Sequence, residues 1–141
     1  MTAVKLELPV NTPAADVWSV IGRFDSLAEW HPGVTTCVGG TNDKGQITRT
    51  ITYANGQVVV ERLVDHDDAV RSYTYVVESG RMPVRDLLGQ LTVAGNDGQA
   101  RIFWTADFEP LAGIPEARAV GIIESIVRGP EAKLVERFGA A

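Results

Sequence analysis

The segment at residues 114–138 is the only part of this chain with sustained helical periodicity. Apolar residues recur there at intervals of three and four, which places them on one stripe of an amphipathic helix. The stripe consists of Ala119, Ile122, Ile123, Ile126, Val127, Leu134 and Phe138. Because almost everything before it alternates with the period of β-strands, we expect a curved sheet that folds around this one helix.

The dipeptide Gly129-Pro130 lies inside the stripe, where an ordinary packing helix would avoid it. Proline cannot donate a hydrogen bond to the carbonyl of Ile126, and its ring presses on that carbonyl. The helix therefore either kinks or stops and restarts with Pro130 in its first turn. We predict a break or bend between Val127 and Glu131, with the Ile126 carbonyl available to a ligand or an ordered water.

The remainder of the chain is predicted to be mostly strands. Residues 4–8 alternate as a first strand, and Asn11-Thr12-Pro13 predicts a side-chain-capped helix that runs to about Ile21. A second short helical piece is expected at residues 25–29. Period-two alternation and turn residues then predict six further strands, at residues 34–38, 47–53, 57–65, 71–78, 87–94 and 100–109. The predicted fold class is α+β, a single domain over residues 1–141 with about seven antiparallel strands and a long C-terminal helix.

Composition excludes several classes of function. The net charge is −5 and no Lys/Arg cluster is present, which argues against nucleic-acid binding. One cysteine, Cys37, cannot form an internal disulfide, and the N-terminus has no signal-like or membrane-inserting run, so we expect a cytoplasmic protein. The sequence leaves a monomer and a homodimer open as alternatives. Two widely separated histidines and the absence of a phosphate-binding glycine motif predict no metal and no cofactor.

Strand phase identifies one polar pair. Glu61 shares a strand face with Val59 and Leu63, where an unpaired carboxylate is costly, and Arg49 is in phase to meet it from the adjacent strand. One interpretation is a buried ion pair that fixes strand register. The alternative is a charged anchor for a ligand carbonyl or hydroxyl, or a base with a shifted pKa.

Aromatic residues and a histidine supply the other candidates. Trp30-His31 is expected where the short helices meet the first long hairpin, and His31 is either a structural residue or a general acid/base. His66, beside three aspartates, is expected to be solvated. An aromatic set is either core filling or a platform for a flat ligand: Tyr73, Tyr75, Trp104 and Phe108.

A series of short motifs resembles the START / birch-pollen-allergen (SRPBCC) superfamily, and within it the bacterial polyketide cyclase/dehydrase-like branch. The motifs are Val10-x-x-Pro13-x-x-x-Val17-Trp18, Trp30-x-Pro32-Gly33, Gly56-x-x-x-x-Glu61-Arg62-Leu63, Tyr73-x-Tyr75, Pro83-Val84 and Trp104-x-x-x-Phe108-x-Pro110. The resemblance implies a helix-grip fold with a cavity between sheet and helix. Gly129-Pro130 departs from the usual uninterrupted final helix. Members include hydrophobic-ligand carriers, hormone receptors and aromatase/cyclases, so the fold alone does not decide the function.

Three functions follow as hypotheses. The first is binding of a small hydrophobic, cyclic, aromatic or polyketide-like molecule. The second is a cyclase/dehydrase-type enzyme without metal or nucleotide cofactor, with Glu61, Arg49 and His31 as candidate catalytic residues. The third is a protein-interaction module. The expected ligand-binding residues are Trp30, His31, Arg49, Glu61, Leu63, Tyr73, Tyr75, Trp104, Phe108, Ile122, Ile123 and Ile126.

Overall fold

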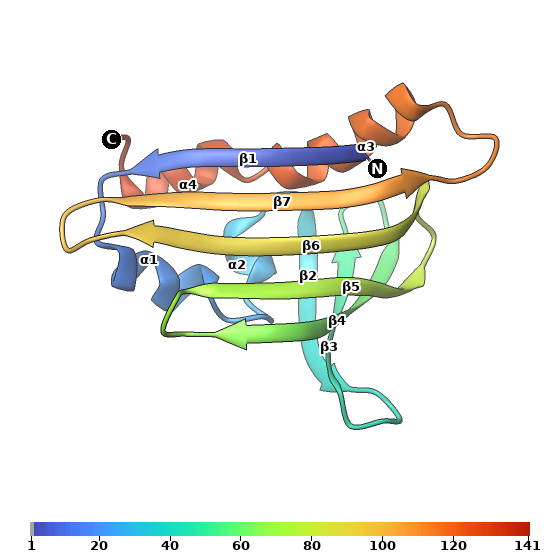
Figure 1. The fold of residues 1–141 in the computed structure, drawn as a ribbon, viewed down its shortest axis with the longest axis horizontal. Coiled ribbons are helices and arrows are strands. Elements are labelled where there is room, and N and C mark those ends of the chain that lie inside the picture. Colours follow the sequence, from blue (N-terminus) through green and yellow to red (C-terminus); the bar gives the residue numbers. More distant parts are fainter. Residues whose placement is uncertain (1) are drawn as a thin grey trace.

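A seven-stranded antiparallel sheet forms the body of the protein in a computed structural model that describes residues 2–141 (Figure 1). The strands are β1 (Thr2–Val10), β2 (Val34–Thr41), β3 (Ile47–Tyr53), β4 (Val58–Asp67), β5 (Ser72–Gly80), β6 (Val84–Gly95) and β7 (Ala100–Pro110). Their spatial order is β1-β7-β6-β5-β4-β3-β2, so five hairpins join β2 to β7 and β1 closes the far edge. The predicted strand number and fold class are confirmed.

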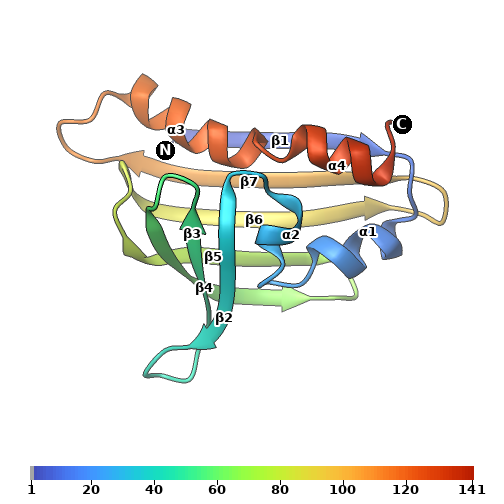
Figure 2. The same cartoon turned by 180° about the vertical axis from the view of Figure 1, so that it is seen from behind.

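The sheet is strongly bent. In Figure 2, β2 and β3 run across the direction of β1, β6 and β7. Register shifts between Val60 and Glu61, and between Leu63 and Asp65, interrupt the pairing of β4 with β5. Such bulges increase local twist and bend a strand. They lie on both sides of Glu61, so the residue sits where the sheet curves around its inner face.

Four helices cover that inner face, namely α1 (Ala14–Ile21), α2 (Leu27–Trp30), α3 (Glu116–Arg128) and α4 (Glu131–Phe138). α3 packs on β1 and β7, α4 packs on β1, and the two short helices pack on β6, β7 and β2 (Figures 1 and 2). The sheet folds around the C-terminal helix as expected, and the two short helices add contacts with β2, β6 and β7.

The predicted break in the terminal helix is confirmed. α3 ends at Arg128 and α4 begins at Glu131, with Gly129 and Pro130 between them. Both of these residues keep φ and ψ near helical values, and α4 continues roughly along the line of α3 (Figure 2). The interruption therefore removes hydrogen bonds without redirecting the chain.

The expected side-chain cap on α1 is wrong. Its N-cap position is Pro13, and no side chain of the described residues caps it. The Thr12 hydroxyl instead donates to the carbonyl of Phe138 at 2.6 Å, and the Asn11 N–H donates to the carbonyl of Gly139 at 2.9 Å. Both residues therefore tie the start of the chain to the end of α4.

The strand phases place the core as expected. The alternate β7 residues Ile102, Trp104, Ala106 and Phe108 are all buried, as are Tyr73 and Tyr75 on β5. His66 is exposed as expected, although its Nε2 lies 3.0 Å from the carbonyl oxygen of Gly22 and its ring stacks on Trp18 with centroids 5.7 Å apart. Within residues 2–141, no helix is long and apolar enough to span a membrane.

Candidate functional site

Two adjacent cavities lie between the bent sheet and α3. The mouth cavity, of about 290 Å³, is lined by His31, Gly33, Tyr53, Ala54, Asn55, Gln57, Met82, Pro83, Ile122, Ser125 and Ile126. The inner cavity is only about 10 Å³, room for about one water molecule. It is lined by Leu27, Tyr53, Glu61, Tyr75, Met82, Leu87, Trp104, Ala106, Ile123, Ile126 and Val127. Tyr53, Met82 and Ile126 line both cavities and therefore form the partition between them.

Arg49 and Glu61 form a buried ion pair at the inner end of this region. They face each other directly in the β3–β4 register, and Nε and Nη2 of Arg49 lie 2.8 and 2.7 Å from Oε1 of Glu61. Nη1 of Arg49 donates to the carbonyl of Phe24 at 2.9 Å and to the hydroxyl of Tyr73 at 3.2 Å. The guanidinium also lies 4.3 Å from the ring centroid of Phe24, a cation–π distance. Arg49 is thus held on every side by the protein.

Burial sets the protonation of this pair. Burial raises the pKa of the Glu61 carboxyl, and the neighbouring Arg49 opposes part of that rise. For Arg49, burial lowers the pKa, but Tyr73 and Glu61 outweigh it, so the net shift is upward and the guanidinium stays charged. A buried Arg⁺ that donates two contacts to one carboxylate oxygen favours the ionised form of Glu61 at neutral pH.

Tyr75 and Trp104 make a second polar contact in the inner cavity. Nε1 of Trp104 donates to the Tyr75 hydroxyl at 2.9 Å. The Tyr75 ring lies across β6 at Gly89, where an added Cβ would be 2.1 Å from Cζ of the ring. Glycine in a strand interior marks such a close approach. Burial raises the pKa of the Tyr75 phenol well above its ordinary value, and the Glu61 charge adds to the rise.

His31 is fixed by two backbone groups. The N–H of Gly33 donates to Nδ1 at 3.0 Å, so Nε2 carries the proton and donates to the carbonyl of Ile126 at 2.6 Å. Pro130 has no N–H to donate to that carbonyl, and His31 donates to it instead. The expectation that the carbonyl is available to a ligand or an ordered water is therefore wrong. Gly129 makes room for the ring, because an added Cβ would lie 3.0 Å from Cε1 of His31.

The imidazole is consequently held neutral. Burial lowers the pKa of His31, and the hydrogen bond to Ile126 opposes this only in part. A general acid/base needs a free nitrogen facing the substrate. Both ring nitrogens are already used, so the geometry favours the structural interpretation of this residue.

The predicted ligand-binding residues fall into three groups. Five line the inner cavity: Glu61, Tyr75, Trp104, Ile123 and Ile126. His31, Ile122 and Ile126 line the mouth cavity. The others line neither cavity and belong to the surrounding packing: Trp30, Arg49, Leu63, Tyr73 and Phe108. Trp30 donates from Nε1 to Ser26 Oγ at 3.0 Å and packs edge-on against Trp104.

Two residues of the partition were missed from the sequence. Tyr53 shares the strand phase that identified Arg49, so the same signal could have found it. Met82 lies in the irregular segment between β5 and β6, where no periodicity exists to place it. Burial raises the pKa of the Tyr53 phenol, with a further contribution from Glu61.

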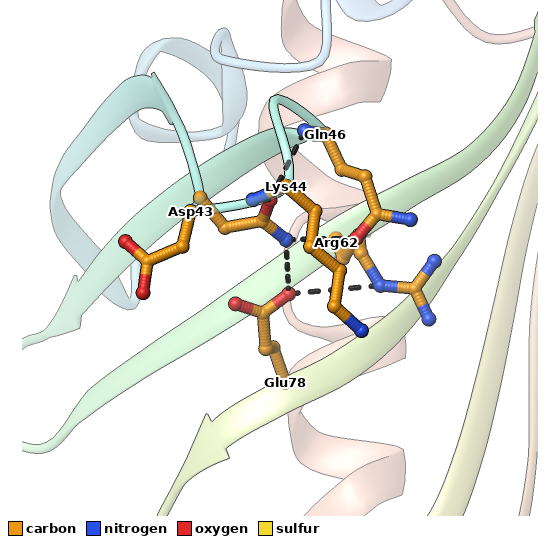
Figure 3. Close-up of a pocket in the computed structure, with 6 residues that line it drawn as sticks. Asp43, Lys44, Gln46, Arg62 and Glu78 are labelled. Atoms are coloured by element: carbon orange, nitrogen blue, oxygen red, sulfur yellow. Dashed lines mark hydrogen bonds and ion pairs between the residues drawn. The ribbon is translucent and has the colours of Figure 1, made fainter.

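A larger hollow, of about 370 Å³, lies on the outer surface at the β2–β3 turn (Figure 3). Oε2 of Glu78 accepts a hydrogen bond from Nδ2 of Asn42 at 3.0 Å and lies 3.6 Å from Nε of Arg62. The remaining lining residues are Asp43, Lys44 and Gln46. Small-molecule sites combine apolar walls with a few enclosed polar groups. This hollow has neither, so the mouth and inner cavities are the candidate site.

No group of three or more metal-ligating side chains is present among residues 2–141.

A curved antiparallel sheet closed over a C-terminal helix, with an enclosed space between them, defines the helix-grip class of proteins. The sequence matches the family described as polyketide cyclase / dehydrase and lipid transport over residues 1–139. The chain therefore belongs to this family, and the resemblance noted from the motifs is confirmed. No curated protein matches the sequence at a significant level.

Solved structures agree on the fold. The protein XoxI from Bacillus cereus has a TM-score of 0.87 at 23% identity, over 98% of this chain and 96% of that one. The Zhui aromatase/cyclase from Streptomyces sp. R1128 has a TM-score of 0.74 at 17% identity, over 96% and 89%. A START superfamily protein from Mycobacterium smegmatis has a TM-score of 0.74 at 14% identity, over 96% of both chains.

Proposed function

We propose that the protein binds a small hydrophobic molecule that enters through the mouth cavity and reaches Glu61 in the inner cavity. The observation that carries this proposal is the pair of adjacent cavities with a shared partition. The mouth cavity has apolar walls from α3 and from the segment before β6, and a buried carboxylate lies behind it. This combination of apolar walls and few convergent polar groups is typical of ligand sites.

The partition must move for a ligand to occupy both cavities, because the inner cavity is too small on its own. Met82 is suited to this movement. Its side chain is unbranched, it is only partly buried, and it lies outside the strands. Rotation of Met82 would remove one of the three residues of the partition.

A charge placed in the wall of the mouth cavity tests the proposal. Ile122 lines this cavity and is 37% exposed, so Ile122→Glu should keep the protein folded and weaken binding of apolar probes at least tenfold. Val70→Glu is the matched control, because Val70 is 62% exposed and lines neither cavity. Titration with naphthalene, followed by thermal shift and native mass spectrometry, measures both. Equal affinity of the two variants would refute the site.

An enzyme of the cyclase type is the second candidate, and one observation favours it. Glu61 and Tyr75 are two titratable groups that line the same inner cavity. Glu61 has a raised pKa and could accept a proton, whereas Tyr75 has a pKa too high to release one easily near neutral pH. Cyclisation of a poly-β-ketone thioester by the wild type, lost in Glu61→Gln, would establish this alternative.

A further inference from the structure

We propose that the inner cavity selects hydrophobic ligands that end in a neutral hydrogen-bond donor, such as an alcohol or phenol, and discriminates against carboxylates. This inference rests on the proposed binding function. It concerns the charge and hydrogen-bonding character of the end of the ligand that enters the inner cavity. That character is determined by Glu61, by Tyr75 and by the fact that Arg49 is already hydrogen-bonded within the protein.

Arg49 is unavailable to a ligand anion. Its contacts go to Oε1 of Glu61, to the Phe24 carbonyl and to the Tyr73 hydroxyl, and the side chain is 1% exposed. Arg49 lines neither cavity. A fatty acid or aromatic acid would therefore find no guanidinium to bind, although an arginine lies close behind the wall.

No other cation replaces it. The side chains that line the two cavities include no lysine and no arginine among residues 2–141. His31 is at the mouth, but both of its nitrogens are engaged with backbone groups and its pKa is lowered. An ionised ligand carboxylate would thus lose its hydration and meet the negative charge of Glu61.

Glu61 offers an acceptor instead. Both close nitrogens of Arg49 contact Oε1, which leaves Oε2 to receive another donor. Glu61 is 5% exposed and lines the inner cavity. An ionised carboxylate accepts hydrogen bonds and donates none, so a ligand hydroxyl fits this position and a ligand carbonyl does not.

Tyr75 completes the recognition of a hydroxyl. Its oxygen accepts from Trp104, so its own proton remains to be donated. A ligand hydroxyl can donate to Glu61 and accept from Tyr75 in the same cavity. An ether of the same shape can only accept, and an unsubstituted hydrocarbon can do neither.

Four naphthalene probes of similar size separate these cases near neutral pH. We expect 2-naphthol to bind about tenfold more tightly than 2-methoxynaphthalene, with naphthalene similar to the ether and 2-naphthoate weakest. If the wild type binds none of the four, the proposed function itself fails. If naphthalene binds but 2-naphthol shows no preference over the ether, or 2-naphthoate binds best, the donor inference is overturned and the binding function stands.

Two variants assign the preference to Glu61. Arg49→Met/Glu61→Leu removes both charges together, so naphthalene should still bind while the tenfold preference for 2-naphthol disappears. Glu61→Gln introduces an amide donor and should strengthen binding of 2-acetonaphthone, a ketone, several-fold. Persistence of the naphthol preference in the double variant overturns the inference. If the double variant does not fold, Glu61→Gln decides the question. A ratio of 2-acetonaphthone affinity to 2-naphthol affinity that is the same in Glu61→Gln as in the wild type also overturns the inference.

Discussion

Replacement of His31 by phenylalanine tests the role of this residue at the helix break. Phenylalanine keeps a planar ring against Trp104, whose centroid is 6.0 Å away, but has no nitrogen. The Gly33 N–H and the Ile126 carbonyl both lose their partner. An orphaned buried group costs about 1–3 kcal/mol. Because both groups border the mouth cavity, where water can reach them, we expect a total loss of about 2 kcal/mol in the free energy of unfolding.

The pH dependence of this loss identifies its cause. Burial lowers the pKa of His31 in the folded protein below the value of about 6.5 in the unfolded chain. The unfolded state therefore binds more protons between these two values. The contribution of His31 to the free energy of unfolding of the wild type is fully present above about pH 6.5. It falls as the pH drops, by up to about 1.4 kcal/mol per pH unit. His31→Phe lacks this pH-dependent contribution. The difference in the free energy of unfolding between the wild type and His31→Phe should therefore become smaller as the pH is lowered.

Urea unfolding of both proteins at about pH 7.5 and about pH 5.5 measures the gap. All other titratable groups, including His66, are present in both proteins, so their contributions largely cancel in the difference. A gap that stays constant or widens at the lower pH would refute a neutral His31 held by the two backbone groups. A negligible gap at the higher pH would show that water replaces both hydrogen bonds at no cost.

Two further changes have definite expected outcomes in the same unfolding assay. Gly89→Ala should displace the Tyr75 ring from β6, break its hydrogen bond with Trp104 and cost about 1–3 kcal/mol; an unchanged stability would contradict the close approach. Arg49→Met should cost about 3–5 kcal/mol because Glu61 is left buried without its partner, and adding Glu61→Leu should recover most of the loss. A double variant as unstable as the single one would show that the ion pair itself stabilises the fold.

Much of the fold could be predicted because buried strands and helices leave a periodic pattern. The alternation of residues in β7 identified its inward face, and the phases of β3 and β4 brought Arg49 opposite Glu61. The break at Gly129-Pro130 followed from the missing N–H of proline alone. These features depend on neighbours in sequence or on one face of one strand.

The site was harder to predict because it depends on contacts between distant segments. The proline showed that the Ile126 carbonyl lacks its helical hydrogen-bond donor. Nothing near Ile126 in the sequence indicated that His31, 95 residues away, would donate to this carbonyl. Met82 lies in an aperiodic segment, and Gly89 shows its purpose only when the Tyr75 ring is seen to cross it. Tyr73 and Phe108 are buried but line neither cavity, because inward-facing residues also fill the core beyond the cavities.

The pairing of β1 with β7 has a consequence for the order of folding. Thr2 lies opposite Phe108 and Val10 opposite Ala100, whereas β2 to β7 are joined successively by hairpins. We expect the hairpins to form first and β1 to join the sheet late, with refolding on a timescale of roughly milliseconds to seconds. Since α3 packs on β1 and β7, the cavity wall is completed in the same late step. A bound ligand should therefore slow unfolding while leaving the refolding rate nearly unchanged.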